Sequence, residues 1–346
     1  MATVNRGSEY WIERTLQLED ALNSRALEYY YELEAAYIEA ARRTSAELLV
    51  LYNRLAGNND ITLTEARKLL IGRELQEFKW SLEEYIEKGR ANQLNPAWTT
   101  ALENASLRYR ISRLEAMKIQ MQNQVEILMG NELDGVTRLM NDMYVEGYYR
   151  TGHMLDVGFG IHHSFARIDT RQVEKVLAKP WLADGLNFSE RIWGKHRPEL
   201  VSTLHKELTQ SIIRGEKPDR LIKVISKKFD VAKHNAGNLV LTESAYFSNV
   251  AQQECYDELD VEYQKFMATL DTRTSETCRS MDGKVFKSSE VQVGVNAPPL
   301  HCRCRSVMVP YFDDMKGERA ARDKDGRSIY VPSDMTYDEW YDKYIK

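Results

Sequence analysis

Apolar side chains recur at three- and four-residue steps along most of the chain. From Tyr10 to about Leu55 there is no proline or glycine, and the apolar positions are Leu22, Ala26, Tyr29, Leu33, Tyr37, Ala40, Leu48, Leu51 and Leu55. This spacing places them on one face of an α-helix, with charged residues on the other face. The pattern predicts one long helix that ends at the turn-forming residues 57–60. We interpret its apolar stripe as intramolecular core rather than as a seam for another protein.

The helical pattern continues beyond this turn. A second helix is predicted from Thr64 to near Gly89, and a third from Ala97 to about Leu128. Helical spacing then extends from Glu132 to Arg150. Glycines follow, which predicts a looser connection, and we place a soft domain boundary from Gly152 to Asp169.

Further helices are predicted over residues 170–260. One of them begins near Leu221, and another runs from about Ala232 to Leu259. The pattern then changes to alternation from Tyr263 to Leu270, followed by short apolar runs near residues 284–286 and 307–309, which are typical of small strands. The end of the chain is charged and then aromatic, and its candidate anchors are Tyr330, Tyr337, Trp340, Tyr341 and Tyr344.

These patterns predict a mainly α protein with elongated helical N-terminal and middle regions and a small α+β C-terminal unit. We divide the chain into a long-helix region (1–151), a helical middle region with a basic segment (170–260) and the C-terminal unit with its tail (261–346).

Composition is that of a soluble, folded chain, with 43% apolar and 29% charged residues. No run approaches the roughly 20 apolar residues that cross a bilayer, and the first eight residues lack a secretory signal. We therefore expect cytoplasmic synthesis and no membrane partner. A net charge of −5 argues against a dedicated basic nucleic-acid binder, although an average can conceal a local patch.

Such a patch is a candidate within the middle region, where basic residues outnumber acidic ones. The candidate phosphate contacts to double-stranded DNA are Arg191, Lys195, Arg197 and Lys206. Acidic residues are interspersed and no base-reading motif is present. We therefore favour the alternative of an ordinary solvated helical face.

Cysteine usage points to free thiols or metal binding rather than to disulfides, because no secretion signal is present. Cys278, His301 and Cys304 are soft ligands that could hold zinc, completed by a carboxylate or by Cys302. The alternative, which we favour, is structural: buried thiols act as small hydrophobes, while His301 and Asp271 hydrogen-bond the turn backbone. A nucleophilic cysteine has little support, because no oxyanion site or orienting group is evident.

One ordered set of residues lies between Asp271 and Asp314. It consists of an aspartate-led turn, a cysteine, a Met-Asp-Gly step, two prolines and a histidine followed three residues later by cysteine, that is, Asp271, Arg273, Cys278, Asp282, Gly283, Pro298, Pro299, His301 and Cys304. This pattern resembles the phage head morphogenesis family, the minor head proteins similar to protein F of phage Mu. Ser275 stands where many members carry the first cysteine of a Cys-x-x-Cys pair. Chemistry that needs two cysteines in this turn is therefore in doubt.

The resemblance implies a minor head (capsid) protein of a tailed bacteriophage that associates with the portal and affects head assembly, DNA packaging or DNA ejection. It implies the portal protein and genomic double-stranded DNA as partners, and the major capsid or a scaffolding protein as further candidates. The expected location is the capsid interior near the portal, after assembly in the host cytoplasm.

We expect no enzymatic activity and no required cofactor, with zinc considered only for the cysteine and histidine cluster. Two other functions stay open. One is a zinc-dependent nucleic-acid-binding module. The other is a toxin-like or ADP-ribosyltransferase enzyme, since C-terminal domains of this family can be joined to such modules. Neither a glycine-rich nucleotide loop nor a clear catalytic set supports the enzyme.

Overall fold

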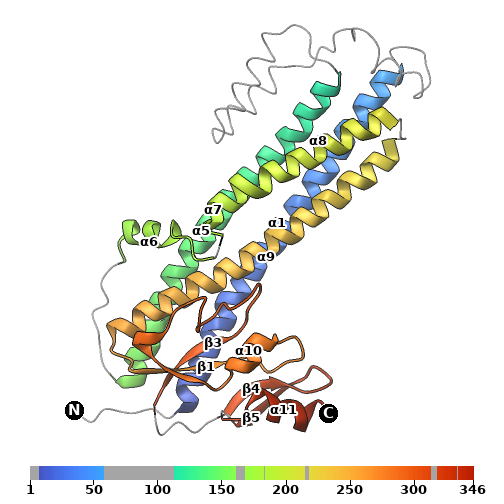
Figure 1. Cartoon of the computed structure of the whole chain (residues 1–346). Coiled ribbons are helices and arrows are strands. Elements are labelled where there is room, and N and C mark those ends of the chain that lie inside the picture. Colours follow the sequence, from blue (N-terminus) through green and yellow to red (C-terminus); the bar gives the residue numbers. More distant parts are fainter. Residues whose placement is uncertain are drawn as a thin grey trace. The chain divides into compact units, whose positions relative to one another are not determined.

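The computed structural model describes residues 8–57, 113–160, 168–182, 184–214, 218–312, 318–332 and 334–346. These residues form long helices followed by a small unit of short antiparallel strands, which confirms the predicted fold class (Figure 1). The predicted helix from Thr64 to Gly89 and the first part of the next one, residues 97–112, lie outside the described residues. Among the helices that are described, none is both long and apolar enough to cross a membrane.

The helical part consists mainly of long helices, and the predicted first helix is confirmed. Its bounds are α1 (Ser8–Gly57), α5 (Arg113–Phe159), α6 (Thr170–Leu177), α7 (Phe188–Glu190), the π-helix η1 (Arg191–His196), α8 (Arg197–Arg214) and α9 (Pro218–Glu258). Most of the apolar stripe of α1 is buried, namely Leu22, Ala26, Leu33, Tyr37, Ala40 and Leu48. These positions therefore belong to the core of the chain itself, as predicted.

Glycines in α5 do not loosen the helix. The predicted looser connection from Gly152 onward is wrong as far as Phe159, because α5 continues to that residue. A Cβ atom on Gly158 would lie 2.1 Å from an indole carbon of Trp11, and one on Gly147 would lie 3.3 Å from the Cβ atom of Ala251. Both glycines thus serve close packing within a helix.

Helix α9 is likewise one element. The sequence predicts two helices here, the second from about Ala232, but the structure has a single helix from Pro218 to Glu258. Buried apolar side chains continue across the expected break and onward to the end, as Phe229, Ala236, Val240, Phe247 and Ala251 show. This continuous buried face supports one helix because no proline or glycine pair interrupts it.

The C-terminal unit contains a three-stranded antiparallel sheet in the order β2-β1-β3, in which Phe266 lies opposite Met308. A β4-β5 hairpin follows, and Leu270 bridges to Ala321 of β4. The predicted small strands are confirmed. The bounds are β1 (Tyr263–Met267), α10 (Glu276–Met281), β2 (Val285–Lys287), the 3₁₀ turn η2 (Ser288–Glu290), β3 (Val307–Tyr311), β4 (Glu318–Arg322), β5 (Ser328–Pro332) and α11 (Tyr337–Tyr344).

Two small cores hold this C-terminal unit. One surrounds β1 and β3 and contains Phe266, Ala268, Cys278, Ala297, Cys304 and Met308. The other joins the hairpin to α11 and contains Leu270, Ala321, Val331, Tyr337 and Trp340. The predicted aromatic anchors Tyr337 and Trp340 are thus confirmed, and Tyr341 and Tyr344 pack against the same core. The prediction is wrong for Tyr330, because this side chain is 72% exposed.

The chain divides into two compact units. Of the described residues, those within 1–30, 137–187 and 238–346 form the first unit, and those within 31–136 and 188–237 form the second. The C-terminal strands and the cysteine cluster belong to the first unit. The three regions proposed from the sequence stay a prediction.

Candidate metal centre

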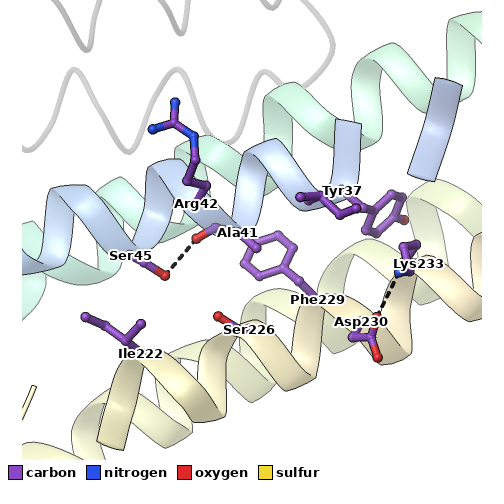
Figure 2. A pocket seen from close by; sticks show the side chains of 10 residues that line it. Tyr37, Ala41, Arg42, Ser45, Ile222, Ser226, Phe229, Asp230 and Lys233 are labelled. Atoms are coloured by element: carbon purple, nitrogen blue, oxygen red, sulfur yellow. Dashed lines mark hydrogen bonds and ion pairs between the residues drawn. The ribbon is translucent and has the colours of Figure 1, made fainter. Parts of the chain in front are cut away.

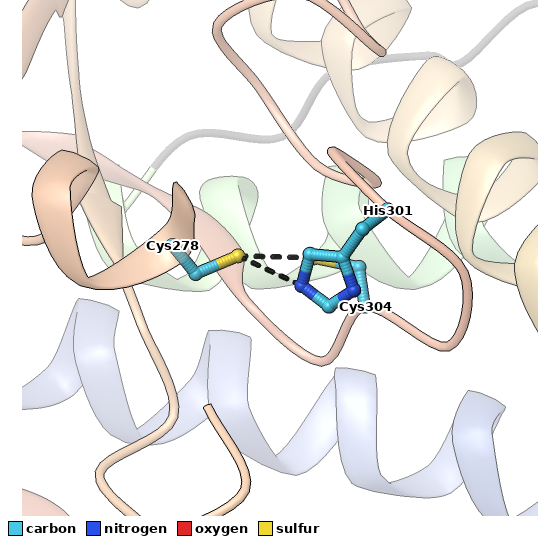
Figure 3. A group of neighbouring side chains, drawn as sticks. All are labelled: Cys278, His301 and Cys304. Atoms are coloured by element: carbon cyan, nitrogen blue, oxygen red, sulfur yellow. Dashed lines mark hydrogen bonds between the residues drawn. The ribbon is translucent and has the colours of Figure 1, made fainter. Parts of the chain in front are cut away.

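Two thiols and one imidazole converge between α10 and the loop before β3 (Figure 3). Cys278 Sγ lies 3.2 Å from His301 Nε2 and 3.5 Å from Cys304 Sγ. One ligand atom from each residue lies within 4.8 Å of the other two. Both cysteines are buried and His301 is half-buried. The three candidate ligands from the sequence are therefore brought together.

Local structure fixes both sides of this cluster. Cys278 lies in the first turn of α10, where its N–H donates to the N-cap hydroxyl of Ser275 at 3.3 Å. On the other side, Arg303 has a positive φ of 57° and its N–H donates to Thr242 Oγ1 at 3.1 Å. Its guanidinium donates to Asn238 Oδ1 at 2.8 Å. The ligand loop is thereby attached to α9, and Ser275 has a capping role in place of a cysteine.

The imidazole ring is oriented by the backbone. His301 Nδ1 lies 2.9 Å from the carbonyl oxygen of Cys302. A carbonyl oxygen can only accept, so Nδ1 carries a hydrogen and Nε2 is the ring nitrogen that faces Cys278. Histidine ligands of metal ions usually have this arrangement, with the second ring nitrogen held by a carbonyl or carboxylate.

The pKa values of the two thiols shift in opposite directions because the thiols share one hydrogen bond. The hydrogen bond from Cys278 lowers the pKa of Cys304 to about 5, although burial opposes this, and backbone hydrogen bonds at Leu300 and Ser306 lower it too. The same bond raises the pKa of Cys278, and burial raises it further. The pair therefore gives up its first proton from Cys304 rather than from Cys278.

Two cysteine thiolates and an imidazole are ligands that zinc favours, so the residues present fit this ion, and its binding would release the proton that Cys278 holds. The fourth ligands considered from the sequence do not join them. Cys302 is exposed and lies outside the group. Asp271 instead binds Arg305. A nucleophilic role for Cys304 has no support either, because the residue is only 6% exposed.

Asp271 organises the turn that precedes α10. Its carboxylate accepts two hydrogen bonds from the Arg305 guanidinium, at 2.5 and 2.9 Å, and one from the Thr274 hydroxyl at 3.1 Å. The backbone N–H of Arg273 donates to it at 2.9 Å. Burial acts to raise the pKa of Asp271, but the hydrogen bonds and charge of Arg305 outweigh it, so the pKa is lowered. The carboxylate thus remains ionised and joins the turn before α10 to the segment before β3.

Asp282 forms a second, deeper ion pair. Its carboxylate lies 3.0 Å from the Arg319 guanidinium, and the two side chains are 1% and 2% exposed. It also accepts the backbone N–H of Ala268 at 2.8 Å. Because Arg319 lies on β4, this pair joins the hairpin to the end of β1. Gly283 follows with φ 78°, a left-handed turn that suits glycine.

Arg273, a residue of the sequence motif, does not make the close ion pair with a motif aspartate. Arg273 is 76% exposed in its side chain and only approaches Asp271 at 3.7 Å. Arg305 and Arg319 make the close pairs instead. Arg305 stands in the Cys-Arg-Cys-Arg run, which is a usable signal, but nothing in the sequence marks Arg319. Pro298 and Pro299 are buried and joined by a cis peptide bond.

The candidate DNA contacts differ in accessibility. Arg191 is buried. Arg197 binds Glu126 at 2.6 Å and stacks over the Trp193 ring. Lys195 and Lys206 are exposed. These two lysines therefore have the accessible side chains that phosphate contacts need.

A groove of about 400 Å³ lies between α1 and α9 in the second unit. Figure 2 shows the Phe229 ring reaching from α9 toward α1, with Lys233 and Asp230 at one end. Lys233 binds Asp230 at 2.9 Å and Glu34 at 3.0 Å. The groove is lined by Tyr37, Ile38, Ala41, Arg42 and Ser45 of α1, and by Ile222, Ser226, Phe229, Asp230 and Lys233 of α9.

Comparison with known proteins agrees with the motif. Residues 202–309, which contain the whole cluster, match the family model described as Phage Mu protein F like protein. This match supports the predicted resemblance of the chain to the phage head morphogenesis family. It is similar to minor head protein GP7 of Bacillus phage SPP1, with 23% identity over 266 residues that cover 71% of this chain and 85% of that protein.

A second relative is the NAD(+)–arginine ADP-ribosyltransferase EFV of Enterococcus faecalis (strain ATCC 700802 / V583). The identity is 24% over 212 residues, which cover 57% of this chain. The matched part spans only 42% of the enzyme's length, so its activity is not carried over to this chain. No solved structure matches the chain.

Proposed function

We propose that this chain is a minor head protein of a tailed bacteriophage, located in the capsid interior near the portal. The observation that carries the proposal is the match of residues 202–309 to the family, with the motif from Asp271 to Cys304 inside it. Similarity to minor head protein GP7 over 71% of the chain supports it. In this role the chain acts by binding, during head assembly, DNA packaging or DNA ejection, and needs no turnover.

The portal protein is the proposed main partner, and α1 offers a surface for it. Tyr31, Ile38 and Leu49 are 63%, 57% and 40% exposed. They are separated by seven and eleven residues, which returns each to the same side of a helix that turns about 100° per residue. Ile38 also lines the groove. An exposed apolar stripe of this kind supports docking of a protein partner.

Capture of the purified full chain by immobilised portal protein tests the docking proposal. We expect Ile38→Asp to weaken capture by roughly tenfold or more, the effect of losing an interface anchor. Val231→Asp is the matched control, because Val231 is 54% exposed on α9 and outside the stripe. Failure to capture the wild-type chain would contradict portal binding. Equal capture of wild type and Ile38→Asp would exclude the stripe as the surface.

Genomic DNA is the second proposed partner, through Lys195 and Lys206. Each phosphate contact contributes about 0.9 to the slope of log affinity against log salt concentration. Reversing both charges should therefore reduce this slope by about two. Lys343→Glu on α11 is the control. A slope that Lys195→Glu with Lys206→Glu leaves unchanged would mean that these lysines are only solvated surface.

A further inference from the structure

We propose that Cys278, His301 and Cys304 bind one zinc ion, which joins α10 to the loop before β3. The sequence alone favours a purely structural role for these thiols. The structure adds two observations that favour a bound cation. These are the separations of the three ligand atoms and the orientation of the imidazole. The proposal is independent of portal and DNA binding, so its failure leaves the proposed function untouched.

The separations match a tetrahedral metal site. Zinc binds sulfur at about 2.3 Å and imidazole nitrogen at about 2.0 Å, which places tetrahedral ligand atoms roughly 3.5 to 3.8 Å apart. Cys278 Sγ lies 3.2 Å from His301 Nε2 and 3.5 Å from Cys304 Sγ, and no pair exceeds 4.8 Å. The two separations from Cys278 need shifts of about a few tenths of an ångström for coordination, and the separation of His301 from Cys304, which is within 4.8 Å, needs at most about 1.3 Å.

The imidazole already has the orientation that a metal ligand needs. The carbonyl of Cys302 fixes a hydrogen on His301 Nδ1, so Nε2 is the ring nitrogen that faces the thiols. The backbone around both cysteines is held as well, by the Ser275 cap and by the hydrogen bond between Arg303 and Thr242. A preorganised set loses little conformational entropy when the ion binds.

The surroundings explain what the ion does. Cys278 and Cys304 lie in the small core around β1 and β3, next to Phe266 and Met308. A core of this size supplies limited stability, and a zinc site adds binding free energy to folding. Among the residues that the structure describes, three protein ligands converge, which leaves the fourth position to water on the half-buried side of His301.

Metal analysis of the full chain, purified with a thiol reductant and without chelator, tests the site. We expect about one zinc per chain, and thiolate-to-metal charge-transfer absorption when cobalt(II) replaces zinc. Cys278→Ser and Cys304→Ser should each lower the affinity for zinc. The loss should exceed the roughly 10- to 100-fold that follows when a metal ligand loses its outer hydrogen-bond partner. Cys302→Ser, exposed beside the site, and Cys255→Ser, buried away from it, are the matched controls.

X-ray absorption of the zinc-loaded wild-type chain keeps the test decisive if a serine variant fails to fold. We expect two sulfur neighbours at about 2.3 Å and nitrogen or oxygen neighbours at about 2.0 Å. Less than about a tenth of an equivalent of zinc, without cobalt charge transfer, would overturn the site. Loss of zinc in Cys302→Ser, or a shell of four sulfurs, would overturn the assigned ligands.

Discussion

Replacing Arg319 by methionine should open the β4-β5 hairpin selectively. The Arg319 guanidinium lies 3.0 Å from Asp282, and both side chains are at most 2% exposed. It also donates to the carbonyl oxygens of Ala268 and Met335. Methionine keeps much of the side-chain volume but removes the charge and every one of these donors. The carboxylate of Asp282 then remains buried without its cation.

The free-energy cost of this substitution follows from the burial of the ion pair. Breaking a buried ion pair from one side costs about 3–5 kcal/mol. Asp282 keeps the hydrogen bond from the Ala268 N–H at 2.8 Å, so we take the lower end, about 3 kcal/mol. Because about 1.4 kcal/mol changes an equilibrium tenfold, the opened fraction of the hairpin should rise roughly 100-fold.

Hydrogen exchange followed by mass spectrometry measures this opening in peptides that cover β4 and β5. Arg322→Ala is the matched control, since Arg322 lies on the same strand but is exposed, and should change exchange by about twofold at most. Adding Asp282→Asn to Arg319→Met should recover most of the loss. Exchange in Arg319→Met within about twofold of wild type would refute the importance of this pair.

Two further predictions concern the helices. Burial raises the pKa of Glu132 from its ordinary 4.5 to about 7, with Tyr37 donating to it at 2.6 Å. Because the folded pKa lies above the unfolded one, the stabilisation is full below pH 4.5 and about 3 kcal/mol of it is lost as the pH rises to about 7. Glu132→Gln should remove this part of the pH dependence in urea titrations and leave the part from Glu19, whose pKa burial also raises to about 7. An unchanged pH profile would contradict the prediction. Gly158→Ala should lower the thermal midpoint, because its Cβ would meet the Trp11 ring, at a cost of about 1–3 kcal/mol. Gly194→Ala should leave the thermal midpoint unchanged, because a Cβ atom there would meet nothing within 4 Å. Equal midpoints for Gly158→Ala and the wild type would exclude the packing role of Gly158.

Elements with a regular pattern could be predicted from the sequence. The long apolar stripe defines α1, and alternation defines β1, because each depends only on neighbours along the chain. The structural role of a glycine cannot be predicted from its neighbours along the chain in this way. Gly152 and Gly158 look like a flexible connection, but the close packing of Trp11 against Gly158 within α5 depends on residues far apart in sequence.

The sequence could predict which residues make up the candidate site, but not which contacts support them. Cys278, His301 and Cys304 have recognisable chemistry, and the order of motif residues indicates the family. The partner of Asp282 was not predictable, because Arg319 comes from a strand that joins the unit only in three dimensions. The attachment of the ligand loop to α9 through Thr242 is likewise a tertiary contact without a local pattern.

Mass spectrometry of purified virions, with DNA-filled heads and empty procapsids separated, tests the proposed function most directly. We expect peptides of this chain in the heads together with portal and major capsid protein, at a small fraction of the copy number of the major capsid protein. Absence of the chain from both heads and procapsids, with portal protein readily detected in each, would contradict a role as a minor head protein.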